Sequence, residues 1–191
     1  MNRPVVPSIS PPRMSIEAFE AWAERQDGRY ELVRGYPVMM NETTRNHSKI
    51  TTNLVRCLLN VIDPDIYHVA IGDFGLETGK DTVRLADVMV TPNEGSGKDR
   101  RTEEALLLIE ILSPSTSHVD FGDKQREYLA LSSLQAYLIV AQDKACAWLW
   151  VRGEDGFPAK PEVIEDLEAT LTIAALDITL TLQTIYRGVA F

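Results

Sequence analysis

The stretch ALLLIEILSPST, at positions 105–116, restricts the possible folds of this chain more than any other segment. A run this apolar is typical of a β-strand covered on both faces, as found inside the sheets of α/β proteins. Glu110 nevertheless lies well inside it. An ionised carboxylate is costly to remove from water unless a partner compensates it. The strand is therefore predicted to be central, and its acid to have a chemical role.

Hydrophobic patterns along the rest of the chain change between helical and strand periods. They predict an α/β fold with a mixed central β-sheet flanked by helices, and we expect a single domain over 14–191 after a flexible, proline-rich arm at 1–13. Helices are predicted at 15–26 with Ser15 as N-cap, at 45–62 and at about 122–131, with a last helical turn within 181–188. Further strands are predicted at 29–40 (two, broken near Gly35), 66–71, 74–78, 82–91, 136–141 and 145–152, the last two forming a hairpin around 142–144.

Composition narrows the class of protein. The two cysteines, Cys57 and Cys146, belong to no C-x-x-C pair, which favours a reducing compartment over a disulfide framework or a zinc site. No apolar run approaches the roughly 20 residues needed to cross a bilayer. We therefore expect no membrane contact and a cytoplasmic location. The net charge of −9 counts against a broad nucleic-acid surface, so binding DNA would require a metal-loaded acidic site or a local basic patch.

A second acid, Asp87, also interrupts an apolar segment, TVRLADVMVT. If 82–91 forms one strand, alternation places Asp87 among apolar side chains. Sequential strands are usually close in space, so Asp87 and Glu110 are expected to meet. Adjacent carboxylates repel each other, and Mg²⁺, commonly held by one or two carboxylates plus substrate phosphate oxygens, removes that repulsion. Such an ion polarises a phosphoryl group and activates a bound water, while Lys124 could stabilise the developing negative charge.

Six segments, taken in order, resemble a large bacterial family described as putative restriction endonucleases, within the PD-(D/E)XK nuclease superfamily. The segments are YELVRG, H-x-x-I in the second predicted helix, VRLADVMV, LLIEILSPST, D-x-x-x-K-x-x-x-Y and SLQAYLIV. The resemblance covers roughly 15–152, and IEILSPST and DFGDKQREY are its most specific parts.

This resemblance implies a restriction-endonuclease-like core in a PD-(D/E)XK nuclease-like domain, with DNA as substrate and Mg²⁺, or Mn²⁺, as cofactor. Asp87 matches the acid of the "PD" motif, Glu110 the acid of the "(D/E)XK" motif, and Glu31 the N-terminal acid of the family. The expected metal ligands are Asp87, Glu110 and the backbone carbonyl of Ile111, with Glu31 joining through water. Lys124 would orient the attacking water. A homodimer is compatible with the resemblance, although no residue pattern indicates one.

Two positions depart from the superfamily motif. Ala86 replaces the proline of "PD", which is not a ligand, and Leu112 stands where the motif has its lysine. In this family the basic residue looks displaced to the following helix, where Lys124 matches it. The catalytic interpretation therefore requires that Lys124 reach the acids.

Each candidate also has a structural interpretation. Glu110 could be an acid at a strand end, hydrogen-bonded to backbone, and Asp87 taken alone is equally compatible with a structural role. Glu31 could face solvent, and a lysine on a helix, such as Lys124, is most often solvated. Tyr128 is expected to be a packing residue with a polar tip.

Other polar motifs are given structural explanations. The three histidines show no metal-ligand spacing, although His47 shares a helix face with Ile50 and Leu54 and is a secondary candidate for the site. GSGKD lacks the features of a phosphate loop. Ser113, Ser115 and Thr116 have no G-x-S-x-G around them and suit a turn or an N-cap. Trp148 and Trp150 suit core packing or a dimer contact better than base stacking.

The sequence thus predicts a metal-dependent endodeoxyribonuclease with Asp87, Glu110, Lys124 and Glu31 as catalytic residues. The alternative is a nuclease-derived fold that no longer cuts and acts as a binding or assembly module. The acidic net charge and the missing strand lysine favour this alternative.

Overall fold

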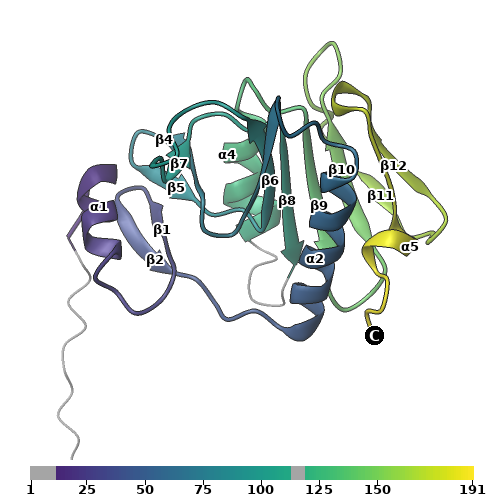
Figure 1. Ribbon diagram of the computed structural model, residues 1–191, viewed down its shortest axis with the longest axis horizontal. Coiled ribbons are helices and arrows are strands. Elements are labelled where there is room, and N and C mark those ends of the chain that lie inside the picture. Colours follow the sequence, from purple (N-terminus) through teal and green to yellow (C-terminus); the bar gives the residue numbers. More distant parts are fainter. Residues whose placement is uncertain (1–11, 113–118) are drawn as a thin grey trace, which may run out of the picture.

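The computed structural model describes residues 12–112 and 119–191, which form β-sheets of six, five and two strands with helices packed against them (Figure 1). Residues 1–11 of the predicted arm lie outside the described residues. So does 113–118, which contains Ser113, Ser115, Thr116 and His118.

The larger sheet contains the predicted central strand, β8. Its spatial order is β11 (Glu162–Ile164), β10 (Ala147–Val151), β9 (Ala136–Ala141), β8 (Leu107–Leu112), β6 (Val88–Pro92) and β3 (Tyr67–Ile71). Strands β8 and β9 run parallel, whereas the other neighbours pair antiparallel. The sheet is therefore mixed, as predicted, and β9 and β10 form the expected hairpin.

One face of this sheet carries most of the apolar core. Ile109 and Ile111 of β8 pack there with Leu54 and Leu58 of α2 (Arg45–Leu59), the second predicted helix. The C-terminal segment belongs to the same core, with β12 (Thr170–Ile173), η2 (Ala174–Leu176), β13 (Ile178–Thr181) and α5 (Leu182–Ile185). Figure 1 shows this segment beside α2.

The opposite face of the larger sheet carries η1 (Asp120–Lys124), a π-helical turn that continues into α4 (Gln125–Leu129). Leu108 of β8 packs on this side with Tyr128 and Tyr137. Side chains alternate along a strand, so Glu110 points to the same side as Leu108, toward η1 and α4. The larger sheet thus lies between the apolar core that packs against α2 and the polar groups around Glu110.

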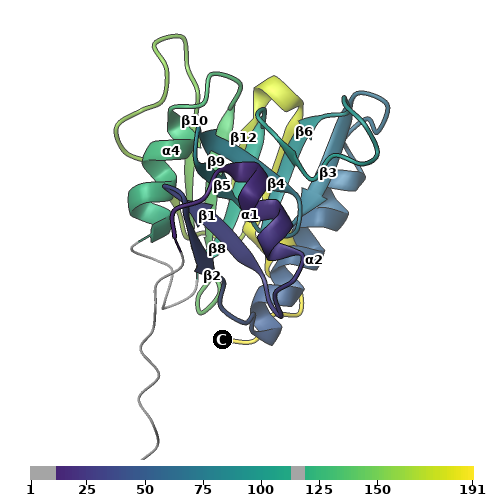
Figure 2. The same ribbon diagram turned by 90° about the vertical axis from the view of Figure 1, so that its left-hand side faces the viewer.

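The smaller sheet has the order β2 (Tyr36–Met39), β1 (Tyr30–Val33), β5 (Thr82–Arg84), β4 (Gly75–Gly79) and β7 (Arg101–Thr102). Helix α1 (Ile16–Ala23) begins at the predicted N-cap Ser15, whose side chain accepts a hydrogen bond from the Ala18 N–H at 3.2 Å. Apolar residues of α1 pack against Leu32 and Val83 of this sheet. Figure 2 shows α1 lying in front of it.

The prediction of one strand over 82–91 is wrong. The chain leaves β5 at Arg84 and enters β6 at Val88, and these strands belong to different sheets. Asp87 lies in the bend between them, because its carboxylate accepts a hydrogen bond from the Ile111 backbone instead of lying on a strand face. The two sheets are therefore joined at the point where Asp87 is held.

The tryptophans of β10 take part in packing, as predicted. Trp150 is 1% exposed, and Phe121 contacts both Trp148 and Trp150 with ring centroids 5.1 and 6.2 Å away. Within the part of the chain that the structure describes, no helix is both long enough and apolar enough to span a bilayer.

Candidate active site

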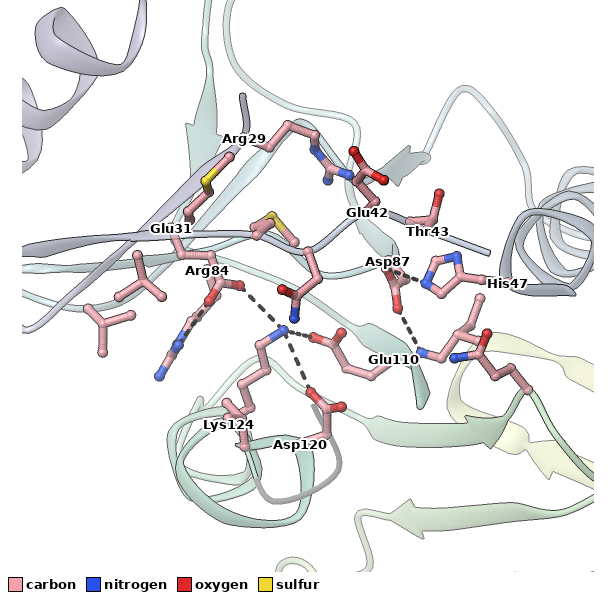
Figure 3. Close-up of a pocket in the computed structure, with 18 of the residues that line it drawn as sticks. Arg29, Glu31, Glu42, Thr43, His47, Arg84, Asp87, Glu110, Asp120 and Lys124 are labelled. Carbon is pink, nitrogen blue, oxygen red and sulfur yellow. Dashed lines mark hydrogen bonds and ion pairs between the residues drawn. The ribbon is translucent and has the colours of Figure 1, made fainter. Parts of the chain in front are cut away.

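A cavity of about 290 Å³ opens where β1, β5, β6 and β8 approach η1 and the start of α2 (Figure 3). The predicted residues Glu31, Asp87, Glu110, Ile111 and Lys124 all line it. The wall nearest solvent includes 38–44, which leads from β2 into α2. The fold therefore brings together residues from four separate segments of the sequence.

Lys124 points inward from the end of η1 and is only 6% exposed. Its Nζ lies 2.9 Å from Glu110 Oε1, 3.3 Å from Glu31 Oε1 and 3.8 Å from Asp120 Oδ1 (Figure 3). Burial lowers the pKa of Lys124, but the three acids outweigh burial and raise it above the ordinary value. Lys124 is therefore a permanent cation at neutral pH. Single π-helical turns are frequent at functional sites because they displace side chains from the regular helical positions.

Glu110 is 3% exposed and is held by two donors from the helical side of the sheet. Its Oε1 accepts hydrogen bonds from Lys124 Nζ and from the Tyr128 hydroxyl, each at 2.9 Å. Lys124 and Tyr128 lie four residues apart and so present their side chains on one helical face. Burial raises the pKa of Glu110 to about 8, with help from neighbouring acids, and Lys124 offsets only part of that increase.

Arg84, at the end of β5, is the second buried cation of the site and is 2% exposed. It donates to Glu31 Oε2 at 2.9 Å and to both carboxylate oxygens of Glu127 at 2.7 and 2.8 Å. The Leu85 N–H donates to Glu31 Oε1 at 3.0 Å. Burial raises the pKa of Glu31, but Lys124, Arg84 and the Leu85 N–H lower it by more, so Glu31 stays ionised.

Asp87 is fixed from two directions. Its Oδ2 accepts a hydrogen bond from the Ile111 N–H at 2.7 Å, and its Oδ1 lies 3.1 Å from His47 Nε2. Helix α2 presents His47 from its first turn, where the N-cap Thr44 accepts a hydrogen bond from the His47 N–H at 3.1 Å. The Asp87 side chain remains 14% exposed at the cavity, so it is the most accessible acid of the predicted set.

The structure agrees with the structural interpretation of some candidate residues and disagrees with that of others. Glu31 does not face solvent, since it is 6% exposed, and Lys124 is not a solvated helix residue. Tyr128 is fully buried with its hydroxyl on Glu110, as predicted for a packing residue with a polar tip. The secondary candidate His47 lines the cavity and contacts Asp87.

Three charged residues of the cluster have no predicted role, namely Arg84, Asp120 and Glu127. Asp120 is the first residue of the D-x-x-x-K-x-x-x-Y segment, and its i, i+4 spacing to Lys124 was a usable signal. Arg84 gave a weaker one, as a charge inside an otherwise apolar segment. The sequence around Glu127 contained no such signal, because its ion pair with Arg84 forms only when the chain folds.

The oxygen ligands around the cavity are of the kind that a hard divalent cation prefers. The cluster holds more carboxylates than cations, with Glu31, Asp87, Glu110, Asp120 and Glu127 around Lys124 and Arg84. Within 12–112 and 119–191, no group of three or more His, Cys, Asp or Glu side chains is arranged to hold a metal ion. Mg²⁺ needs only one or two carboxylates when waters and substrate phosphate supply the other ligands. Asp87 and Glu110, which line the cavity with Ile111, supply the two carboxylates that such an ion would need.

Comparison with known proteins places these residues in a family. The profile of the Uma2 family, whose description is "Putative restriction endonuclease", matches residues 16–183. The uncharacterized protein slr1290 of Synechocystis is 29% identical over 97% of each chain. A second uncharacterized protein of that organism, sll1609, is 27% identical over 62% of this chain and 70% of its own.

A solved structure shares the fold. The crystal structure of a putative nuclease belonging to DUF820 from Anabaena variabilis superposes with a TM-score of 0.72 at 15% identity, covering 91% of this chain and 97% of that one. The solved structure shows the shared fold, and the match over 16–183 shows that the chain belongs to the Uma2 family of putative restriction endonucleases.

Proposed function

We propose that this protein is a Mg²⁺-dependent endonuclease that hydrolyses DNA phosphodiester bonds at a PD-(D/E)XK-type site. The observation that carries the proposal is the inward position of Lys124, whose Nζ lies 2.9 Å from Glu110 in the cavity that Asp87 also lines. This contact supports Lys124 as the counterpart of the basic residue that the superfamily motif has on the strand.

The roles of the side chains follow from their charge and position. Asp87 and Glu110, with the Ile111 carbonyl, would bind Mg²⁺, or Mn²⁺ in its place, and such an ion polarises the phosphoryl group and lowers the pKa of a bound water. Lys124 keeps its proton, so it orients the attacking water and stabilises negative charge that develops on the phosphoryl oxygens. Glu31 stays ionised and accepts a hydrogen bond from that water.

Gln142 supplies further support for a ligand rich in acceptors. It lines the cavity and is 6% exposed, and its Nε2 has no hydrogen-bond partner within the described residues. A buried donor without an acceptor is costly. A phosphate oxygen of a bound strand would satisfy it.

Nicking of supercoiled plasmid in Mg²⁺ or Mn²⁺ tests the proposal. Wild type is expected to nick the plasmid, and Glu110→Gln and Lys124→Met are expected to lose at least about a hundredfold in rate, because each removes a group that acts in the transition state. Glu77→Gln is the matched control, since Glu77 is a partly buried acid paired with an arginine away from the cavity. Cleavage retained in Glu110→Gln would assign the activity to another site or to a contaminant.

A protein that binds the metal and DNA but cuts no DNA form would instead be the binding or assembly module. The net charge of −9 favours that alternative. The burial of Lys124 beside Glu31, Glu110 and Asp120 favours the enzyme, because ionisable groups are costly to hold out of water in a site that has no use for them.

A further inference from the structure

An apolar track leads out of the cavity along the β1–β2 hairpin. The hairpin turns through Arg34 and Gly35, which both have positive φ (53° and 83°), as in the tight turns that match strand twist. This turn sets the register and places Glu31 opposite Val38. Residues directly opposite in an antiparallel pair share a face.

The same register pairs Val33 with Tyr36, two residues further along each strand. Glu31, Val38, Val33 and Tyr36 therefore lie on one face, in order from the cavity to the turn. Val33 and Val38 line the cavity. Tyr36 is 49% exposed and Val38 46%, whereas Glu31 is buried. The face thus passes from the buried acid to exposed apolar side chains without interruption.

Two arginines lie at the outer end of this track. The Arg34 side chain, at the turn, is 68% exposed, and the Arg13 side chain is 59% exposed. Arg13 packs against Gly35, where an added Cβ would crowd the Arg13 side chain. Each arginine has one surface carboxylate partner, Asp123 for Arg34 and Asp81 for Arg13.

The side chains of the track suit an unpaired nucleic-acid strand better than a duplex or an added protein strand. A duplex keeps its bases paired and stacked on each other, whereas an unpaired strand can stack them on aromatic and apolar side chains. Exposed arginines beside such a surface suit the phosphates of the same strand. A protein strand added to the edge of β2 suits it less, because Pro37 lies in β2 and has no N–H to pair.

We propose that the track formed by Val33, Val38 and Tyr36, with Arg13 and Arg34 at its end, binds single-stranded DNA and leads it into the cavity. This inference rests on the proposed function and names its substrate class. Tyr36 stacks a base outside the cavity, the two valines contact the next nucleotide, and the arginines pair with phosphates. An unpaired strand is then a better substrate than a duplex.

Fluorescence anisotropy with the full chain in EDTA tests binding. The probe is a labelled mixed-sequence oligodeoxynucleotide of about 16 nucleotides, offered as a single strand or annealed to its complement. The single strand is expected to bind at least tenfold more tightly than the duplex. The slope of log K against log salt should be about −1.4, because two arginines neutralise two phosphates of a single strand. Equal or tighter duplex binding would overturn the proposal.

Variants locate the binding on the track. Tyr36→Ala should weaken single-strand binding about tenfold, through loss of one stacked base, whereas Tyr36→Phe should stay within about twofold. Val38→Ser should weaken it about threefold, and Val163→Ser, an exposed valine on β11, should not change it. Unfolding of each variant by urea checks that it is folded. Wild-type affinity in Tyr36→Ala would refute the track.

Two further outcomes separate this inference from the proposed function. Plasmid nicking by wild type that Tyr36→Ala does not impair, combined with unchanged DNA binding, would leave the nuclease standing and remove the track. Single-strand binding through Tyr36 without cleavage in Mg²⁺ or Mn²⁺ would keep the track and remove the nuclease. A lower oligomeric mass in Tyr36→Ala with unaltered DNA binding would make this face a contact between two copies, contrary to the proposal.

Discussion

Two networks of charged side chains in this protein differ in depth. Around Lys124 the side chains of Glu31, Glu110 and Asp120 are at most 8% exposed, and they meet at a cavity. The second network joins Arg101 of β7 to Glu20 and Glu77, with side chains 20 to 27% exposed. Both contain more acids than bases, but only the second can rely on water to screen the excess.

The difference shows what marks a candidate site in this fold. Ion pairing alone does not mark the site, because Arg101 also forms ion pairs with two acids, as Lys124 does with Glu31 and Glu110. A buried excess of acidic groups over basic groups does mark the site. Such an excess is unfavourable for stability, and it is retained where it has a function.

Replacing the central cation of each network is the most direct comparison. Lys124→Met should lower the free energy of unfolding by about 3 to 5 kcal/mol without metal, because buried carboxylates lose their counter-charge. Arg101→Met should lower it by about 1 kcal/mol or less, since its partners are partly solvated. Urea unfolding in EDTA measures both. Equal losses would mean that the two networks are energetically alike.

The raised pKa of Glu110 predicts an unusual dependence of stability on pH. Its folded-state pKa of about 8 lies above the ordinary value of 4.5, so the folded protein binds more protons between these limits. Stability without metal should therefore fall as the pH rises through that window, by at most about 1.4 kcal/mol per unit. Glu110→Gln should remove this slope, and Glu77→Gln should retain it. A flat profile for wild type in EDTA would argue against the excess negative charge.

Divalent cations should stabilise the first network and not the second. Mn²⁺ at a hundred times its dissociation constant should raise the free energy of unfolding by about 2.7 kcal/mol. Asp87→Asn and Glu110→Gln should lose most of this gain, because each removes a proposed ligand, whereas Glu77→Gln should keep it. Thermal unfolding with and without Mn²⁺ provides the measurement. Full stabilisation of Asp87→Asn would place the ion elsewhere.

The hydroxyl of Tyr128 should make the smallest contribution. Tyr128→Phe removes one hydrogen bond to Glu110 and keeps the ring, so the free energy of unfolding should fall by about 1 kcal/mol. Urea unfolding checks the value. No loss at all would indicate that the contact with Lys124 is sufficient to hold Glu110.

Local signals in the sequence predicted much of the fold. Ser15 caps α1, the periodicity of 45–62 corresponds to α2, and the pattern at 136–152 is the β9–β10 hairpin. These features depend on neighbours within a few residues, which a sequence displays directly. The break between β5 and β6 was not predicted, because the groups that hold Asp87 in the bend, the Ile111 N–H and His47, are 24 and 40 residues away in the sequence.

The candidate site divides in the same way. Asp87 and Glu110 can be recognised from the sequence as acids in apolar surroundings, because a charge stands out against a hydrophobic pattern. Which charges face one another depends on the packing of the elements. In the folded protein Lys124 turns inward, His47 contacts Asp87, and Arg84 pairs with both Glu31 and Glu127. The physical reason is that electrostatic energy depends on distance and burial. Both are set by how the two sheets and the helices pack.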